Sequence, residues 1–483
     1  ESVKSQIYPY WELCICDDDS TNEDIKEILR TYSLEDKRIK VYFRKQNGHI
    51  CKATNDALKL ASGDYISLLD HDDKLTIDAL YYIAKTILKT PYADLIYSDE
   101  DKINENNQRS SPHFKPSFNI DLLLAYNYIS HLGTYRRSIV EKIQGFRPGL
   151  EGSQDHDLAL RFIREIKPEN IIHIPRILYH WRMHSESTAA SPDSKDYTSE
   201  RGLKAIQDYL KMSNNRNEQQ CTVRCVAPNR FRVNWPVENE VSVELIIPTR
   251  DKAEILEVAV RSIIEKTTYS NYSITIMNNG SEEKNTYELF NELTNKNPEK
   301  IKVLEYNKPF NYSAINNYAA EQSKAEIIGL INNDIEVING EWLHEMVSHC
   351  LRNDVGCVGA KLLYSNETIQ HAGVFTGVLT IAAHGHRDSP RESPGYFGRL
   401  AHTQQLSVVT AACLLVRRTI YNEVGGLNEL NLSVAFNDVD FCLRVHQRGY
   451  RNIYTPYAEL YHYESISRGH EDTRVKKKRF QSE

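Results

Sequence analysis

The feature that most constrains this chain is a long-range internal repeat. The first segment to return is Ile15-Cys16-Asp17-Asp18-Asp19-Ser20, which reappears 261 positions later as Ile276-Met277-Asn278-Asn279-Gly280-Ser281. Further motifs return in the same order, with Asp72 matched by Asp334 and Asp155 matched by Asp438. Repeats of solenoid proteins span about 20–50 residues, so a period this long indicates two whole domains of the same type. The 483 residues, 40% of them hydrophobic, are enough for two separate cores.

Each copy shows an alternation of strands and helices. The first copy has strand-like runs at Trp11 to Cys16 and Ile39 to Phe43, and helical patterns at Asp24 to Tyr32 and Lys52 to Leu60. Such an alternation is typical of a parallel sheet covered by helices. We therefore predict an α/β fold made of two tandem Rossmann-like domains with mostly parallel sheets.

The repeat also predicts the domain boundaries. We expect a first domain at residues 1–190, a polar and partly helical linker at 191–240, and a second domain at 241–483, with the boundary near Glu238 to Val241. The second copy opens with an apolar strand, Val243 to Thr249, which has no counterpart in the first copy. We expect that the first strand of domain 1 is missing from this sequence, and that the C-terminus is also truncated because the run after Arg474 ends without a stop signal.

Composition excludes some partners. The formal charge of −7, from 59 basic and 66 acidic residues, gives no field that would gather nucleic acid. The basic run from Arg474 to Arg479 is either a solvated helix face or a patch for anionic lipid. Nine cysteines without Cys-x-x-Cys spacing indicate core thiols in a reducing compartment. No signal peptide opens the chain, so we expect a cytoplasmic protein, with peripheral association at the inner face of the plasma membrane as the alternative.

The end of one apolar run carries the first candidate site. The run Ser67-Leu68-Leu69 stops at Asp70, and Asp72 follows two residues later on the same side of an extended backbone. Ligands of open α/β sheets bind beyond the carboxyl ends of such strands, where two carboxylates suit Mg²⁺. Acidic capping of the next helix, near Thr76 to Thr90, is the alternative. In the second copy Asp334 retains the second carboxylate, while Asn332 replaces Asp70 and removes one negative charge.

Found twice in the same order, these motifs resemble glycosyltransferase family 2, the nucleotide-sugar transferases of GT-A fold, and specifically the tandem bacterial enzymes that build surface polysaccharides. The resemblance covers nearly the whole chain. It implies that the turn at Asp17 and Asp18 accepts the N3–H of a uracil or thymine base, although an Asx-turn before the next helix explains the same residues. The residues implied to bind the nucleotide sugar are Asp17, Asp18, Asp70, Pro248, Asn278, Asn279 and Asn332.

The resemblance also implies a metal site and a catalytic base in each copy. Mg²⁺ or Mn²⁺ would be held by Asp70, Asp72, Asp334, His180 and His462. A structural role is the alternative for both histidines. The resemblance makes Asp155 and Asp438 the catalytic bases, each at the start of a helix, where capping of the helix N-terminus is a compatible role. We expect Asp157 and Asp440 to pair instead with the arginines four residues later.

The predicted function is an inverting glycosyltransferase that adds sugars from UDP-, dTDP- or GDP-linked donors to a glycan or lipid-linked acceptor, one linkage per domain. The alternative is one active domain and one degenerate domain that binds glycan or sugar nucleotide. The acceptor loops are expected at Ser98 to Asp101 and at Gln370 to Gly373. A dinucleotide-binding protein is disfavoured because no Gly-x-Gly-x-x-Gly motif follows the first strand of either copy.

Overall fold

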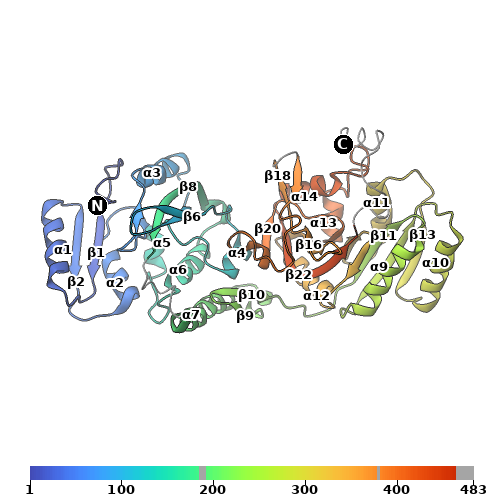
Figure 1. The fold of residues 1–483 in the computed structure, drawn as a ribbon, viewed down its shortest axis with the longest axis horizontal. Helices are drawn as coiled ribbons and strands as arrows, with labels where there is room; N and C mark the ends of the chain where they lie inside the picture. The colour runs from blue at the N-terminus through green and yellow to red at the C-terminus, as the bar shows by residue number, and fades with distance from the viewer. Residues whose placement is uncertain (184–191, 378–380, 464–483) are drawn as a thin grey trace. The chain divides into compact units, whose positions relative to one another are not determined.

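A computed structural model describes residues 1–183, 192–377 and 381–463 (Figure 1). The chain divides into two compact units, Glu1–Asn234 and Trp235–Glu483. The basic run from Arg474 to Arg479 lies outside the described residues. Among the residues that are described, no helix is both long and apolar enough to cross a bilayer.

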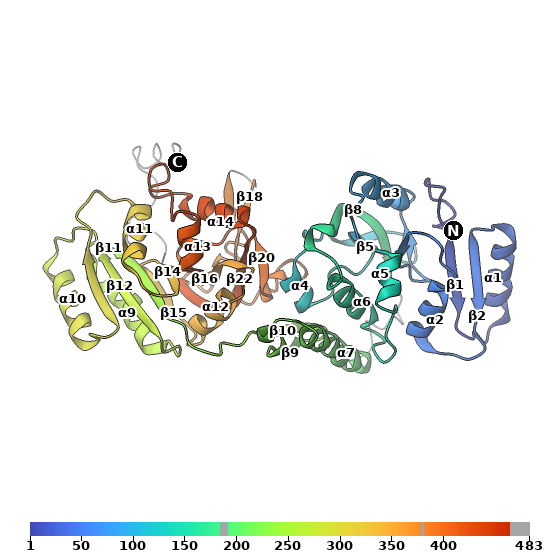
Figure 2. The ribbon, with the colours of Figure 1, turned by 180° about the vertical axis from the view of Figure 1, so that it is seen from behind.

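Unit 2 is built on one mixed sheet whose strands follow the order β13-β12-β11-β14-β21-β16-β22-β15. The pairs β11–β12, β12–β13 and β11–β14 are parallel, and these strands are seen from both sides in Figures 1 and 2. The strands of unit 2 are β11 (Val243–Thr249), β12 (Tyr272–Asn278), β13 (Ile301–Glu305), β14 (Ile327–Ile331), β15 (Ile335–Val337), β16 (Val355–Leu363), β17 (Ile369–His371), β18 (Val374–Thr376), β19 (Ala382–His384), β20 (Gln404–Leu406), β21 (Cys413–Arg417) and β22 (Arg451–His462).

Helices cover both faces of this sheet because alternate strand residues point to opposite sides. One core packs β11 and β12 against α9, α10 and α12, with Trp342 fully buried in it. The other core packs the opposite face against α11, α13 and α14, with Phe441 fully buried. The helices are α9 (Ala253–Lys266), α10 (Lys284–Lys296), α11 (Tyr312–Gln322), α12 (Trp342–Cys350), α13 (Arg418–Glu423) and α14 (Asn437–Gln447), with a 3₁₀ segment at Tyr396–Ala401.

Unit 1 repeats most of the order of elements that unit 2 has from β12 onward, with a sheet in two pieces. A parallel pair, β1–β2, stands apart from a mixed sheet of order β3-β7-β5-β8-β4, and β6 pairs with β5. Its elements before the hairpin region are β1 (Leu13–Asp17), α1 (Glu23–Glu35), β2 (Ile39–Phe43), α2 (His49–Leu58), β3 (Tyr65–Ser67), β4 (Lys74–Leu75), α3 (Ala79–Lys89), β5 (Leu95–Ile103), β6 (Arg109–His113), α4 (Ile120–Ala125), β7 (Gly133–Arg136), α5 (Arg137–Lys142), α6 (Gln154–Ile163), a 3₁₀ turn at Pro168–Asn170, and β8 (Ile171–Arg182).

The split in unit 1 falls where unit 2 has β11. In unit 2 this strand joins β12 to β14, whereas no strand of the described part of unit 1 joins β1 to β3. The strand predicted from the apolar run Ser67-Leu68-Leu69 is β3, which is short. It ends at Ser67, and the chain turns through Asp70 into β4.

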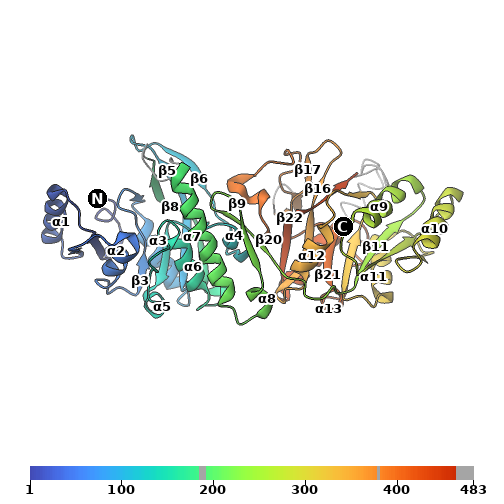
Figure 3. The same cartoon turned by 90° about the horizontal axis from the view of Figure 1, so that it is seen from below.

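The stretch from 191 to 240, predicted to be a linker, mostly packs with unit 1. Helix α7 (Pro192–Lys211) lies along α6, as Figure 3 shows, and α8 (Arg216–Gln219) follows it. The hairpin of β9 (Thr222–Ala227) and β10 (Arg230–Asn234) contacts α7 and α4. The α/β, Rossmann-like architecture predicted from the sequence is confirmed. The sheets contain parallel strands, but they are mixed rather than mostly parallel, with antiparallel pairs in both units.

Candidate active sites

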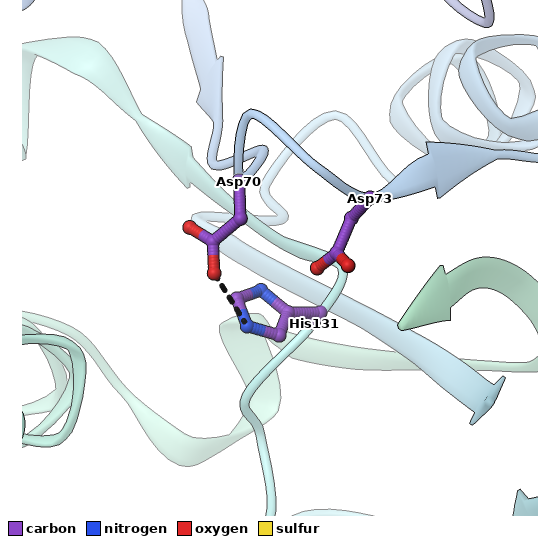
Figure 4. A group of neighbouring side chains, drawn as sticks. All are labelled: Asp70, Asp73 and His131. Carbon is purple, nitrogen blue, oxygen red and sulfur yellow. Dashed lines mark ion pairs between the residues drawn. The ribbon is translucent and has the colours of Figure 1, made fainter. Parts of the chain in front are cut away.

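Three side chains meet at the strand ends of unit 1. Asp70 follows β3, Asp73 directly precedes β4, and His131 lies in the loop before β7, and their ligand atoms lie within 4.8 Å of one another. Figure 4 shows the imidazole of His131 beside both carboxylates. The ring Nε2 is 3.7 Å from Asp70 Oδ2. The sequence predicted Asp70 at this place, but it gave no signal for His131.

Tyr179 contacts all three residues of this cluster. Its hydroxyl donates a hydrogen bond to Asp73 at 2.5 Å and accepts one from the backbone N–H of Asp70 at 3.3 Å. Its ring stacks on the imidazole of His131, with centroids 4.6 Å apart. Burial raises the pKa of both Asp70 and Asp73. A bound cation would offset this cost because it stabilises the ionised carboxylates.

A buried ion pair holds the segment that carries His131. Lys115 Nζ lies 3.1 Å from Glu100 and donates a hydrogen bond to the carbonyl of Ile129 at 2.8 Å. The backbone N–H of His131 donates to Glu100 at 3.1 Å. Glu100 and Lys115 therefore fix His131 through its backbone, from the centre of the unit.

The acceptor loop predicted at Ser98 to Asp101 is instead part of β5 and is buried. Each of its carboxylates has an internal basic partner: His173 for Asp99 at 2.8 Å, Lys115 for Glu100, and His180 and Arg109 for Asp101. Buried carboxylates with internal partners have little capacity left for a substrate, so this expectation was wrong.

His180 and Asp72 stand outside the cluster of unit 1. His180 Nδ1 pairs with Asp101 Oδ1 at 2.5 Å, and its neighbour Tyr179 points to the opposite face of β8. The carbonyl of Asp72 accepts a hydrogen bond from Arg182 at 2.8 Å, and its carboxylate lies 3.9 Å from His71. In the described part of the chain, the group of three that could hold a metal includes neither residue. Both metal roles stay predictions.

Asp155 stands in the first turn of α6. Asn127 donates a hydrogen bond to its carboxylate at 2.8 Å. Its negative charge is one of the causes that raise the pKa of Asp70, after burial, so the two carboxylates are close enough to interact. Asp157 pairs with Arg161 at 2.8 Å, as predicted, and also with Arg147.

Unit 2 builds its site from a different set. His462 Nε2 lies 3.2 Å from Asp334 Oδ1, and Asn332 Nδ2 is 3.2 Å from the same nitrogen. The carboxylate of Asp438, in the first turn of α14, accepts a hydrogen bond from the N–H of Ala411 at 3.2 Å. Ala412, the residue after Ala411, accepts a hydrogen bond through its carbonyl from the backbone N–H of Asn332 at 3.0 Å. One short loop therefore connects Asp438 to the strand-end turn.

A pair of histidines packs against the same loop. His371 Nε2 accepts hydrogen bonds from the backbone N–H groups of Gly373 and Thr410 at 3.3 and 3.4 Å. His371 Nδ1 lies 2.9 Å from His384 Nδ1. Burial and the neighbouring histidines lower the pKa of His371 well below its usual value. His371 belongs to the predicted acceptor segment Gln370 to Gly373, which is buried and overlaps the end of β17.

The predicted base-binding turns lie at the ends of β1 and β12. The Asp17 carboxylate accepts a hydrogen bond from the N–H of Ser20 at 3.2 Å, and Asn278 accepts one from Ser281 at 3.0 Å. Both are Asx-turns of the kind given as the alternative. Asp18 pairs with Arg44 at 2.8 Å and accepts from Gly48, whereas Asn279 donates to the carbonyls of Tyr306 and Lys308, both at 2.8 Å. Pro248 is buried in β11, where it pairs with Met277.

Two Rossmann-like units, each with a polar strand-end turn and an aspartate in the first turn of a nearby helix, form the architecture expected of nucleotide-sugar transferases. The family described as "Glycosyl transferase family 2" matches residues 1–144 and 244–425, and the chain belongs to this family. The membership confirms the resemblance drawn from the ordered motifs.

Two curated relatives match nearly the whole chain. Protein y4gI of Sinorhizobium fredii is 47% identical over 483 residues, which are 100% of this chain and 53% of that protein. The O-antigen biosynthesis protein RfbC of Myxococcus xanthus is 35% identical over 470 residues, which are 97% of this chain and 36% of that protein. The chain therefore spans about half or less of the length of these relatives.

Two solved structures are similar at low identity. The mannosyltransferase PcManGT from Pyrobaculum calidifontis in complex with GDP-Man and Mn²⁺ is 14% identical, with a TM-score of 0.38, over 50% of this chain and 61% of that chain. GalNAc-T7 with UDP, GalNAc and Mn²⁺ is 13% identical, with a TM-score of 0.42, over 51% of this chain and 47% of that chain.

Proposed function

We propose that the chain is an inverting glycosyltransferase with two active sites, one in each unit, that builds a bacterial surface glycan of O-antigen or capsule type. Each site would transfer a sugar from a UDP-, dTDP- or GDP-linked donor and form its own linkage. Family membership and the likeness to an O-antigen biosynthesis protein support this proposal. The acceptor would be a glycan or lipid-linked glycan, reached at the inner face of the plasma membrane.

The observation that carries the proposal is a geometry that occurs twice. In unit 1 Asn127 donates a hydrogen bond to Asp155 at 2.8 Å and accepts one at 3.2 Å from the residue before His131, whose imidazole faces Asp70 at the strand end. In unit 2 the carboxylate of Asp438 accepts a hydrogen bond from the N–H of Ala411. The carbonyl of Ala412 accepts one from the N–H of Asn332 at the strand end. Each unit thus places a helix-terminal carboxylate beside the turn where a diphosphate would lie.

The reaction proposed for each unit is a single displacement. The carboxylate of Asp155 or Asp438 takes the proton from an acceptor hydroxyl, and the oxygen attacks the anomeric carbon of the donor sugar. The bond from that carbon to the diphosphate breaks, the nucleoside diphosphate leaves with the electron pair, and the anomeric configuration inverts. Base assistance of this kind contributes about 10²–10⁴-fold to rate.

The residues present fit a divalent cation. Carboxylate oxygens suit Mg²⁺ or Mn²⁺, and an imidazole nitrogen beside them suits Mn²⁺ better than the harder Mg²⁺. In unit 1 Asp70, Asp73 and His131 would hold the ion, and in unit 2 Asp334 and His462 would hold it. Within the described residues, Nδ1 of each of these histidines is buried and makes no hydrogen bond. The ion, when bound, would neutralise charge on the diphosphate.

Substitution of the two proposed bases tests the function. We expect Asp155→Asn and Asp438→Asn each to lower formation of one linkage by at least about 10²-fold and to leave the other linkage unchanged. The measurement is transfer from a panel of UDP-, dTDP- and GDP-sugars to a short lipid-linked acceptor, with products resolved by mass and linkage.

Asp440→Asn is the matched control, because Asp440 lies two residues after Asp438 on α14 and pairs with Arg444 at 2.7 Å. It should retain both linkages. Wild-type rates in Asp155→Asn and Asp438→Asn would remove both residues as bases. Complete loss in Asp155→Asn with normal products in Asp438→Asn would instead favour the alternative of a degenerate second unit, which Asn278, Asn279 and Asn332 support by replacing carboxylates.

A further inference from the structure

Trp181, at the end of β8, is an exposed aromatic side chain beside the cluster of unit 1. It is 41% exposed. Its indole meets the imidazole of His131 edge to face, with centroids 5.5 Å apart, and His131 in turn faces Asp70. Single exposed apolar side chains are ordinary on protein surfaces. The position of Trp181 is what sets it apart, because its inner neighbour belongs to the candidate active site.

The strand register shows which residue of unit 2 occupies the same place. Strand β7 ends at Arg136 and β21 ends at Arg417, and each is followed at once by a helix. Leu95 in β5 and Cys357 in β16 each pair with the residue just before the end of the neighbouring strand, so these two positions match. Five residues further along each strand, Glu100 matches Leu362.

The next strand completes the comparison. Glu100 pairs with Tyr179 and Leu362 pairs with Leu460, so Tyr179 matches Leu460 and Trp181 matches His462. Lys74 pairs with His180 and Glu336 pairs with Tyr461, so Lys74 matches Glu336. Two residues earlier in each unit, Asp72 therefore matches Asp334. Where unit 2 has a buried imidazole paired with Asp334, unit 1 has an exposed indole.

The surroundings of Trp181 combine an apolar surface with polar groups. Lys102 pairs with it across β5 and β8, and its ammonium lies 5.8 Å from the ring centroid. His131 contacts the indole from the cluster side, and His131 itself stacks on Tyr179. Carbohydrate rings have apolar C–H faces and polar hydroxyl rims, and they bind best where an aromatic face stands beside hydrogen-bonding groups.

We infer that Trp181 is a stacking platform for a hexopyranose ring in the active site of unit 1, and that unit 2 has His462 in place of this platform. The inference rests on the proposed function for the identity of the site. The ring belongs either to the donor sugar or to the terminal sugar of the acceptor. Both sources present the same C–H face to the indole, and unit 2 must bind its sugar by other groups.

Saturation-transfer NMR on the whole 483-residue chain tests the inference. The probes are methyl β-D-glucopyranoside, UDP-glucose and UDP. The variants are Trp181→Ala, Trp181→Phe and, as matched control, Tyr92→Ala, which removes another exposed aromatic ring of unit 1. Because unit 2 can also bind the probes, the readout is the difference between each variant and the wild type.

The expected result is a loss of saturation at the pyranose ring protons, with affinity roughly tenfold weaker, in Trp181→Ala. Trp181→Phe should retain part of the effect, which shows that the site still folds, and Tyr92→Ala should match the wild type. A change seen with UDP-glucose alone assigns the ring to the donor, and a change seen with the methyl glycoside assigns it to the acceptor.

An unchanged ring-proton signal in Trp181→Ala would overturn the inference, as would a change confined to the uracil protons of UDP. No ring-proton signal in the wild type would overturn it too. The variant Asp155→Asn separates this inference from the proposed function. Sugar binding that persists in Asp155→Asn with unchanged transfer refutes the base but leaves the platform in place.

Discussion

Among single residues, His180 and His462 align in the sequence but differ by one position in the strand register. His180 and His462 both follow a Leu-Tyr pair. The register nevertheless places His180 level with Tyr461 and Trp181 level with His462. Because strand side chains alternate between faces, one position moves His180 away from the site and toward Asp101.

This difference predicts that the two histidines contribute unequally to metal binding. We expect EDTA to abolish both transfers and added Mn²⁺ to restore them. His462→Ala should weaken the Mn²⁺ response of the unit 2 linkage by at least about tenfold, because it removes a nitrogen beside Asp334, and His180→Ala should leave both responses unchanged. The measurement is each linkage as a function of Mn²⁺ concentration.

Full transfer in EDTA would refute the metal requirement. Equal effects of His180→Ala and His462→Ala would instead refute the assignment of sites from the strand register.

At the element scale, β5 and β16 occupy the same place in the two units but have opposite chemistry. β5 carries Asp99-Glu100-Asp101, while β16 carries Lys361-Leu362-Leu363. In unit 1 the buried pair of Glu100 and Lys115 holds the loop with His131. In unit 2 the buried Leu362 takes the position of Glu100, so the ion pair is not needed for the fold type itself.

Glu100→Gln should destabilise unit 1 by about 3–5 kcal/mol, because it leaves the ammonium of Lys115 buried without its counter-charge. The double variant Glu100→Leu with Lys115→Met should recover most of this loss, since it places in unit 1 the leucine that unit 2 has at the matching position. Urea unfolding measures both free energies. A single variant that costs less than the double variant would contradict the interpretation of a clamping ion pair.

The same pair makes the stability of unit 1 sensitive to acid. Burial raises the pKa of Glu100, but the charge of Lys115 and a hydrogen bond with His113 outweigh it and lower the pKa to about 2. A pKa lower in the folded state than in the unfolded state stabilises the fold at neutral pH. This contribution should be lost as the pH falls from about 4.5 to about 2, and Glu100→Gln should lack that part of the pH dependence in urea unfolding.

At the scale of the whole molecule, each unit has its own hydrophobic core. The core of unit 1 includes Leu75, Ile96 and Leu178, and the cores of unit 2 lie on the two faces of its long sheet. Each of these three clusters draws its residues from one unit. Separate cores are the condition under which two domains unfold independently.

We expect two unfolding transitions in calorimetry. Phe441→Ala removes a fully buried ring from unit 2 and should cost that unit about 3–5 kcal/mol, so one transition should move down by several degrees while the other stays in place. Leu158→Ala, in the buried face of α6, is the reciprocal control and should move the other transition. A single transition that moves as a whole in both variants would show that the units unfold together.

The duplication, the α/β class, the family and the strand-end positions of Asp70 and Asp334 could all be predicted from the sequence. These follow from local patterns: apolar runs that end in polar residues, helix-type spacing, and an order of motifs repeated at one offset. The pairings of Asp157 with Arg161 and Asp440 with Arg444 were also predictable, because residues four apart meet on any helix.

The other side chains that reach the strand ends could not be predicted from the sequence, because they depend on long-range strand pairing. His131 comes from a loop without a motif, and Tyr179 and Trp181 reach the cluster because β8 pairs with β5 in one register and not in the next. That register depends on strands far apart in the sequence, and on bulges at Ser98 to Glu100 in unit 1 and between Val355 and Lys361 in unit 2. No local pattern encodes such a pairing, since a shift of one residue reverses which face every side chain occupies.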